Sequence, residues 1–521
     1  MAVNFLNGVQ IGTPGTYTFS TQSDTRPIDL LPFRTLYMFG YSATAIADNV
    51  NNPTRISSFA DFENVFPLSQ SRFGVKAFFA NSQGFGNFYF INVGVPKTFS
   101  IEILTGSTAG QVTPGTYSVT INGILKSLIV TGVRTLAQVA TDLIALINAD
   151  TVLNKEVIAV AGITAPFVLI KAKNPKLNSI LTVVVGTNSV TALTTVTPGV
   201  PTASDYVYAI QNSLDPTLEN GIMNAPEAFQ TFDTSGRLVV QIALENVASK
   251  FNFQWSVFVD PGNPTSITNA DRALAERKTY SSVEGHSAYY YPYIYDLDNN
   301  LVPPSSYVAG MAIYRFVRES IAEPPAGVQY PLKGAKKLAY AVSWAEQNVL
   351  NSQGVNCILN KPNYGIVVWG ARTMSSNNLL AFVSTRIIMN VVISSLNKGF
   401  DDYIFRAVGS QATILSDLQR KAIALLDIMW RGGLLYGDSP TAAYGAIADA
   451  SVQIPTLLQQ GITNAFIWVV PSTIIERLII NVEQTEIGGL QARIANTTTL
   501  LQAQIDAGTA APTGAAGGAA V

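Results

Sequence analysis

Apolar positions follow two patterns along this chain, short continuous runs and runs spaced three or four residues apart. Residues 33–41 form a continuous run that predicts a buried strand. Residues 56–66 place three phenylalanines on one helical face, behind a serine that can cap the helix. A second buried strand is expected at 87–93, after a glycine-rich turn. A strand, a helix and a strand in this order predict an α/β unit.

The same alternation resumes after residue 206 and continues almost to the C-terminus. The elements expected first are sheet segments at 239–247 and 255–259, a polar helix at 269–280, an aromatic strand at 289–295 and a buried helix at 338–349. Helices then follow at 377–396 and 411–430, the second stopped by Gly432-Gly433, and late strands at 466–470 and 474–482.

Between these parts lies a stretch rich in Thr, Val, Ile and Gly and almost without aromatic residues. Residues 116–121 and 125–130 alternate around Asn122-Gly123, which is a strong type I′ hairpin signal. Thr135 can cap a helix with apolar positions three or four apart, and two further strands are expected at 167–171 and 181–185. The stretch therefore predicts a self-contained ββαββ domain inserted into the α/β unit.

The N-terminal residues carry almost no charge. Residues 13–16 predict a turn, and Tyr17 and Phe19 alternate with Thr and Ser as in a strand. Such a strand is either an edge strand of the chain's own sheet or a strand that pairs with another chain, and the pattern leaves both interpretations open.

We therefore expect a multi-domain α/β protein. The predicted divisions are an N-terminal arm at 1–22, an α/β domain made of 23–95 and 206–330, the inserted ββαββ domain at 96–205, a C-terminal domain at 331–486 with a closing strand, and an extension at 487–521 ending in an Ala/Gly tract.

Composition narrows the class of partner. Of 521 residues, 48 % are hydrophobic and only 13 % are charged, about half the usual charged share. A soluble monomer normally has a more charged surface, so neighbouring subunits are expected to cover much of this one. The net charge of −2, without a basic block, argues against nucleic acid. The N-terminus lacks the pattern of a signal peptide and no apolar run could span a bilayer, so we expect a soluble protein without membrane insertion.

Candidate catalytic chemistry is sparse. The chain has one cysteine, Cys357, and one histidine, His286, which excludes Cys- or His-rich metal sites and disulfide frameworks. His286 and Asp260 could belong to a hydrolytic triad, but no nucleophile motif frames them. We expect His286 to be a partly exposed loop residue.

Acidic pairs give equally weak signals. Asp401-Asp402 fits a solvated turn better than acid–base chemistry, and Asp296 with Asp298 resembles an incomplete calcium loop. No phosphate-binding glycine motif is present. The sequence thus predicts no catalytic residue, no cofactor and no metal.

The most specific segment is Lys-Pro-Asn-Tyr-Gly-Ile-Val-Val-Trp-Gly-Ala-Arg-Thr at residues 361–373. It predicts a turn, a short buried strand and a strand-to-helix junction with a buried tryptophan. Together with its surroundings, this segment resembles the assembly signature of contractile tail sheath proteins of phages and related injection systems. The matching features, in chain order, are Pro14-Gly15-Thr16-Tyr17, the turn Asn363-Tyr364-Gly365, Val367-Val368-Trp369, Gly370-Ala371-Arg372-Thr373, Arg386, a strand-like Tyr403-Ile404-Phe405, the helix before Gly432-Gly433, and the run from Pro471. The likeness is best over 330–483 and weaker over 206–330.

The resemblance implies a mechanical function. Sheath subunits form hexameric rings stacked helically around an inner tail tube protein, bounded by baseplate and tail terminator proteins. Contraction drives the tube through a target envelope. The implied location is the virion, with assembly in the cytoplasm of the host bacterium.

The resemblance also assigns roles to residues. It implies that Pro14, Gly15, Tyr17 and Phe19 at one end, and Pro471, Ile474, Ile475 and Leu478 at the other, belong to arms that add strands to a neighbouring subunit. The core signature is Asn363, Gly365, Trp369, Gly370, Arg372 and Thr373. Two alternatives from other classes are a non-contractile shell or adhesion protein, and a hydrolase on the 206–330 domain.

Overall fold

The computed structural model describes residues 4–6, 9–11, 28–43, 49–95, 98–103, 111–162, 167–173, 181–185, 190–196, 200–250, 255–408 and 413–480. The chain divides into two compact units, Met1–Ile474 and Ile475–Val521. At the N-terminus, β1 (Asn4–Leu6) and β2 (Val9–Ile11) form a small antiparallel pair. The predicted strand around Tyr17 and Phe19, and the extension at 487–521, lie outside the described residues.

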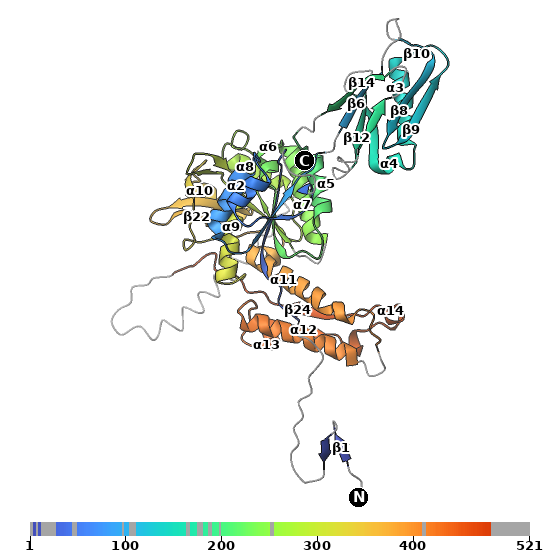
Figure 1. Ribbon diagram of the computed structural model, residues 1–521. Helices are drawn as coiled ribbons and strands as arrows, with labels where there is room; N and C mark the ends of the chain where they lie inside the picture. Colours follow the sequence, from blue (N-terminus) through green and yellow to red (C-terminus); the bar gives the residue numbers. More distant parts are fainter. Residues whose placement is uncertain are drawn as a thin grey trace, which may run out of the picture. The chain divides into compact units, whose positions relative to one another are not determined.

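An eight-stranded sheet organises the first unit (Figure 1). Its order is β22 (Gly365–Trp369), β21 (Val355–Lys361), β17 (Ser287–Tyr291), β16 (Trp255–Val259), β15 (Asn220–Asn224), β3 (Phe33–Gly40), β5 (Asn87–Asn92) and β4 (Thr54–Arg55). The six inner strands are parallel, and the two edge strands run antiparallel to their neighbours. This is a doubly wound order, with its topological switch between β3 and β15.

Helices cover both faces of the sheet, which explains why β15, β16 and β17 are buried at every position. One face packs on α1 (Phe59–Val65), α2 (Arg72–Ser82), α9 (Pro304–Arg318) and α11 (Val383–Phe400). The other packs on α5 (Ala203–Ser213), α6 (Pro226–Thr231), α7 (Thr234–Lys250), α8 (Ala270–Thr279) and α10 (Trp344–Ser352). The expected mixed α/β class is confirmed.

Local signals placed several elements correctly. The strand expected at 33–41 is β3, and the one expected at 87–93 is β5. Ser58 caps α1 by accepting a hydrogen bond from the amide of Asp61. Asn269 caps α8 in the same way. Each cap satisfies an amide that the helix leaves without a partner, so the start of the helix is encoded locally.

The sheet segment predicted at 239–247 is wrong, because those residues lie in α7. Val240, Ala243, Leu244 and Val247 are buried at helical spacing, whereas Val239 is 46 % exposed. The apolar residues are dense enough to resemble a strand, and only the buried positions reveal the period of the helix.

The buried helix predicted at 338–349 is also wrong. Its first part is a strand, β20 (Ala335–Leu338), and α10 starts only at Trp344, behind a capping box formed by Ser343 and Glu346. That serine and glutamate, three residues apart, were the missed signal. Because β21 and β22 pair into the large sheet, the predicted domain boundary at 330/331 falls inside one sheet.

The inserted segment is richer than the predicted ββαββ pattern. Its strands are β6 (Thr98–Ile103), β7 (Gln111–Val112), β8 (Gly115–Ile121), β9 (Ile124–Val130), β10 (Arg134–Thr135), β11 (Val157–Ala161), β12 (Phe167–Ala172), β13 (Val183–Val185) and β14 (Val190–Val196). They form the sheets β11-β12-β6-β14 and β13-β8-β9 and a short β7-β10 pair. Helices α3 (Leu136–Asn148) and α4 (Leu153–Glu156) complete the module, and α3 begins at the predicted Thr135 cap. The type I′ turn is confirmed by positive φ at Asn122 and Gly123. Five predicted elements were real, but the long-range pairing of β6 with β12 and β14 could not be inferred locally.

The C-terminal region contains α11, α12 (Thr413–Arg431), β23 (Tyr444–Ile447) and β24 (Phe466–Val469), with the shorter α13 (Pro440–Ala443) and α14 (Pro455–Gln459). The helix expected at 377–396 starts later, at Val383, and passes through Gly399. The expected 411–430 helix is α12, followed by Gly433 at φ 74°. The strand predicted at 474–482 does not form within its described part, residues 474–480. No helix of the described residues is long and apolar enough to cross a membrane.

The contact between α2 and α9 provides a test of the packing. A Cβ on Gly310 would lie 2.5 Å from the carbonyl oxygen of Phe78, which belongs to the backbone of α2. We expect Gly310→Ala to lower the free energy of unfolding by about 1–3 kcal/mol, because the two helices must move apart. Chemical denaturation followed by circular dichroism measures this. Val317→Ala, on the exposed side of α9, is the control, and equal effects of the two variants would contradict the close packing.

Candidate assembly site

The signature segment is a hairpin at the edge of the large sheet. β21 and β22 pair antiparallel, and the turn between them holds Asn363 at φ 68° and Gly365 at φ 83°. The outer side of β22 is partly covered by the chain itself, since the carbonyls of Ile366 and Val368 accept hydrogen bonds from the amides of Leu332 (2.8 Å) and Gly327 (2.9 Å). The Asn and Gly of the motif are therefore explained by the backbone conformation of the turn.

Trp369 and Gly370 end this hairpin in different environments. The prediction of a buried tryptophan is wrong, because Trp369 is 38 % exposed and the ammonium of Lys361 lies 3.9 Å from its ring centroid. Gly370, by contrast, is tightly enclosed. A Cβ there would lie 2.9 Å from the Cα of Asn356, so a side chain at position 370 would displace β21.

Arg372 is held by its main chain. The side-chain amide of Asn356, fully buried on β21, donates to the carbonyl of Arg372 (2.7 Å) and accepts from its amide (2.6 Å). The guanidinium of Arg372 lies 5.6 Å from the ring centroid of Phe382. The side chain of Asn356 thus satisfies main-chain groups that a neighbouring strand would otherwise bond, at the point where the sheet ends and the following loop begins.

Thr373 connects this junction to α11. Its hydroxyl donates to the carbonyl of Leu380 (2.6 Å), and its amide donates to the carbonyl of Ala381 (2.9 Å). At the start of α11, the amide of Val383 donates to the carbonyl of Ala371 (2.9 Å). Gly370, Arg372 and Thr373 thus belong to one sheet-to-helix connection, whereas Asn363 and Gly365 lie in the turn at the other end of β22.

Arg386 anchors α11 beneath the amino ends of β16 and β17. It is buried, and it donates to Asn390 (2.9 Å) and to the carbonyl of Glu284 (3.1 Å). Burial lowers the pKa of Arg386 to about 10. Asn390 in turn donates to the carbonyl of Trp255 at the start of β16 (3.2 Å). The arginine of this helix supports the junction between helix and sheet.

His286 is buried beside this cluster, so the expectation of a partly exposed loop histidine is wrong. Its Nδ1 lies 3.0 Å from the carbonyl of Trp255, and burial together with the charge of Arg386 lowers the pKa of His286 to about 3. Ser287 and Ser282 donate hydrogen bonds to Glu245, whose pKa is raised by burial. Buried among these groups, the histidine is in no position to reach a substrate, so its role is structural.

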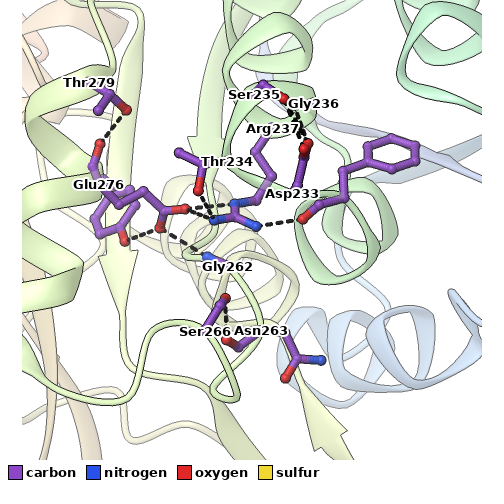
Figure 2. A network of polar contacts seen from close by, with 12 residues as sticks. Asp233, Thr234, Ser235, Gly236, Arg237, Gly262, Asn263, Ser266, Glu276 and Thr279 are labelled. Atoms are coloured by element: carbon purple, nitrogen blue, oxygen red, sulfur yellow. Dashed lines mark hydrogen bonds and ion pairs between the residues drawn. The ribbon is translucent and has the colours of Figure 1, made fainter.

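The carboxyl ends of the parallel strands are where doubly wound proteins usually bind ligands. Here a buried ion pair occupies part of that region (Figure 2). Arg237 of α7 and Glu276 of α8 are each 2 % exposed, and their nearest charged atoms are 2.6 Å apart. Glu276 also accepts from the amide of Gly262, just after β16 (3.0 Å), and from the hydroxyl of Tyr289 (2.9 Å). The pair ties two helices to the loop that follows a central strand.

Other carboxylates at this end are also engaged within the protein. Asp260 accepts from both the amide (2.7 Å) and the hydroxyl (2.6 Å) of Ser305 at the start of α9. Glu227, at the switch point, accepts from the hydroxyl of Ser71 (2.7 Å) and the amide of Tyr41 (3.0 Å). A nearby cleft of about 230 Å³ is lined by prolines, tyrosines, a glycine, an alanine, an isoleucine and a threonine, without an acidic, basic or histidine side chain. Both carboxylates therefore connect elements of the fold.

The calcium-like loop is a turn. Asp296 accepts from the amides of Asp298 (2.9 Å) and Asn300 (2.7 Å), and Asp298 forms an ion pair with Lys76. Asp401 and Asp402 are exposed in a single 3-10 turn. Within the described residues, no group of three or more His, Cys, Asp or Glu side chains is placed to hold a metal ion.

The C-terminal arm exposes large apolar side chains. Pro471 and Ile474 are half-buried, but Ile475 and Leu478 are 84 % and 73 % exposed, and Ile479 is 77 % exposed. Pro14, Gly15, Tyr17 and Phe19 lie outside the described residues. Exposed apolar side chains close together in the chain are typical of a surface that binds another protein.

The antiparallel pair of β23 and β24 precedes this arm, and the connection between the two strands contains α14. Among the described residues these two strands pair only with each other, and Phe466 and Trp468 on β24 are 59 % and 49 % exposed. A two-stranded sheet is marginal alone. The strand-like reading of residues 403–405 is wrong, since Phe405 lies in a turn at φ 67° and is fully exposed.

Comparison with known proteins agrees with the likeness drawn from the motifs. A family described as phage tail sheath protein central domain matches residues 239–374. This stretch is therefore similar to the central domain of phage tail sheath proteins. The match runs from α7 to the end of the signature segment. It includes much of 206–330, where the motif likeness was weaker, and it does not include the motifs after residue 374. Curated proteins gave no match.

Solved structures show the same fold around this sheath domain. The anti-feeding prophage baseplate, 6-fold symmetrised, has a chain that is 16 % identical with a TM-score of 0.56, covering 91 % of this chain and all of that one. The PVC sheath complex of an extracellular contractile injection system, in its contracted state, is 16 % identical with a TM-score of 0.54. That match covers 91 % of this chain and 99 % of the other. The anti-feeding prophage helical sheath in the contracted state is 16 % identical with a TM-score of 0.54, and the match covers 91 % of this chain and 100 % of the other. The resemblance to contractile tail sheath proteins is confirmed.

The amide clamp at Arg372 can be tested by mutation. Asn356→Ala removes both side-chain partners of that main-chain segment, so we expect the free energy of unfolding to fall by about 2–4 kcal/mol. Asn360→Ala, at an exposed position on the same strand, is the matched control and should have little effect. Denaturant titrations of both variants measure the difference, and equal stability would contradict the clamp.

Asp260 predicts a pH dependence. Burial raises the pKa of Asp260 to about 7, above its ordinary value of 3.8, so the folded state holds a proton that the unfolded state releases. This contribution to stability is complete below about pH 4 and is lost as the pH rises to about 7.

We therefore expect Asp260→Asn to gain stability relative to the unmodified chain across that window, on the order of 2–4 kcal/mol. Denaturation at a series of pH values checks this, with Asp402→Asn as an exposed control. The same pH trend in both variants would show that burial of Asp260 is not the cause.

Proposed function

We propose that this chain is the structural subunit of a contractile tail sheath. In this proposal, subunits polymerise as stacked hexameric rings around an inner tube and contract to drive the tube through a target cell envelope. The observation that carries the proposal is the sheath central domain at 239–374, within a fold shared with sheath chains over 91 % of the length. Two of the chains with this fold come from an anti-feeding prophage baseplate and from a contracted helical sheath.

The exposed arm supports polymerisation. Ile475, Leu478 and Ile479 present apolar side chains that a lone subunit leaves in water, at a cost of about 1.5–3 kcal/mol for each one not buried. The strands β23 and β24 pair with no further strand among the described residues, although the chain just after β24 is bonded to residues 434–436. We propose that arms of neighbouring subunits, including Pro471 and Ile474, and the N-terminal residues Pro14, Gly15, Tyr17 and Phe19, add strands to such a sheet. Contacts of this kind are heterologous, so they can propagate as rings and helices.

Contraction in this proposal is a change between two packings of rigid cores joined by arms. The doubly covered sheet and its buried ion pair favour a core that moves as a body. Strand addition by arms would keep neighbours connected while their cores slide. The energy would come from the difference between the two packings and not from a bound nucleotide, in agreement with the absence of a phosphate-binding motif from the sequence.

The proposed partners are further copies of this chain, an inner tail tube protein, and baseplate and tail terminator proteins. The location is the tail of a virion or of a phage-derived injection device, after assembly in the bacterial cytoplasm. The proposed role is not enzymatic, because the histidine and carboxylates that suggested catalysis are engaged in supporting the fold. A non-contractile shell or adhesion protein remains the alternative, distinguished by whether assembled tubes shorten.

Because the arm's apolar side chains are exposed in the subunit, we expect that substituting them prevents assembly without affecting folding. We expect the triple substitution Ile475→Ser, Leu478→Ser and Ile479→Ser to abolish tubes and rings in negative-stain electron microscopy, because the apolar anchors of the arm are lost. Circular dichroism and the melting temperature should remain unchanged, since these side chains are exposed in the subunit. Val317→Ser, another exposed apolar position on the core, is the control and should assemble normally. Intact tubes from the triple variant would contradict the role of the arm.

A further inference from the structure

Two edge strands of the inserted module, β11 and β9, differ in how their outer backbone groups are satisfied. Strand β11 is an edge strand, but the side chain of Asn148 closes it, donating to the carbonyl of Ala159 (2.8 Å) and accepting from its amide (2.9 Å). Strand β9 is the outer strand of the sheet β13-β8-β9, and among the described residues it pairs only with β8 (Figure 1). An unclosed edge is a template for another strand.

The backbone groups at this edge can be assigned from the turn. Ile121 and Ile124 flank the two-residue turn and therefore form a hydrogen-bonded pair. Pairs alternate along the ladder, so Leu125, Ser127 and Ile129 direct their N–H and C=O groups away from β8. These are three donors and three acceptors in a row.

Side chains at the same three positions are exposed. Leu125 is 61 % exposed and Ile129 is 71 % exposed, and Ser127 between them is also exposed. Val184 extends this face across the sheet, with 61 % exposure. Natural edges are usually protected by a charge, a proline or a bulge. The only charged residue of β9, Lys126, forms an ion pair with Asp150 on the opposite face, so it leaves the edge unprotected.

We propose that β9 is a self-pairing edge, at which two copies of this chain join their β9 strands antiparallel with Ser127 opposite Ser127. In this register Leu125 lies opposite Ile129 of the second copy, twice, and the two serines face each other. Apolar and hydroxyl pairs of this kind stabilise antiparallel neighbours. The three outward residues of each strand then supply the six hydrogen bonds of a continuous sheet, and the neutralised Lys126 adds no repulsion.

This self-complementarity favours a second copy over an unrelated strand. The pair has two-fold symmetry and closes at two subunits, unlike the heterologous contacts that build rings. Subunits of one stacked-ring tube all point the same way, so a two-fold pair joins free subunits or subunits of separate tubes, and the inference is independent of the proposed sheath function. It assigns the inserted module a connection between subunits that does not involve the arms.

A cysteine at the centre of the edge tests the register. Opposite residues of a hydrogen-bonded antiparallel pair have Cα atoms about 5.5 Å apart, within reach of a disulfide. The only native cysteine, Cys357, is buried. We expect full-length Ser127→Cys to form a covalent dimer on mild oxidation, seen on a non-reducing gel. Ser118→Cys, the neighbour of Ser127 on β8, should stay monomeric on the same gel.

Three outcomes would overturn the proposal: no dimer from Ser127→Cys, equal dimer from Ser118→Cys, or loss of the dimer when residues 1–22 are deleted. The last result would mean that a neighbouring arm occupies the edge. As a second measurement, Leu125→Lys with Ile129→Lys should shift sedimentation of the full chain from the paired to the unpaired species, whereas Thr116→Lys on β8 should not. Circular dichroism of each variant confirms that the module remains folded.

Discussion

Burial of both faces of the eight-stranded sheet is the constraint on which the rest of this structure depends. Strands that are covered on both sides are buried along their whole length, as β15, β16 and β17 are. Polar groups at the ends of such strands are then trapped inside, where each needs a partner within the chain. Asn356 with Arg372, Asp260 with Ser305, and Arg237 with Glu276 meet this requirement.

The same constraint explains why the features that suggest catalysis are structural. A histidine, several carboxylates and serines lie at the ends of parallel strands, as they would in many α/β enzymes. In this protein they connect elements of the fold: Asp260 binds the start of α9, Glu276 binds the loop after β16, and Arg386 binds the carbonyl of Glu284, ahead of β17. A core fastened in this way suits a part that transmits force, because its elements keep their positions while its contacts change.

Strand edges with unpaired backbone groups indicate where strands of other subunits can bind. The large sheet closes one edge with its own chain at Leu332 and Gly327, and the module closes β11 with Asn148. The β23–β24 pair and β9 keep open edges among the described residues, and both carry exposed apolar side chains. Closed edges limit unwanted association, so the open ones are the sites at which association is expected. The low charge of the chain agrees with a surface that other subunits cover.

Local chemistry in the sequence determined much of this protein. Helix caps at Ser58, Thr135 and Asn269, the Asn122-Gly123 turn, and the strands around β3 and β5 were predictable because each depends on neighbouring residues. The ordered motifs around 361–373 also pointed to the family whose model matches residues 239–374. Tertiary structure alone decided which apolar runs were helices, as in α7, and which side chains were buried, as with His286 and Trp369. Those outcomes depend on residues elsewhere in the chain, and no local pattern carries that information. The pairing of β6 with β14 and the contact of Asn356 with Arg372 are of the same kind.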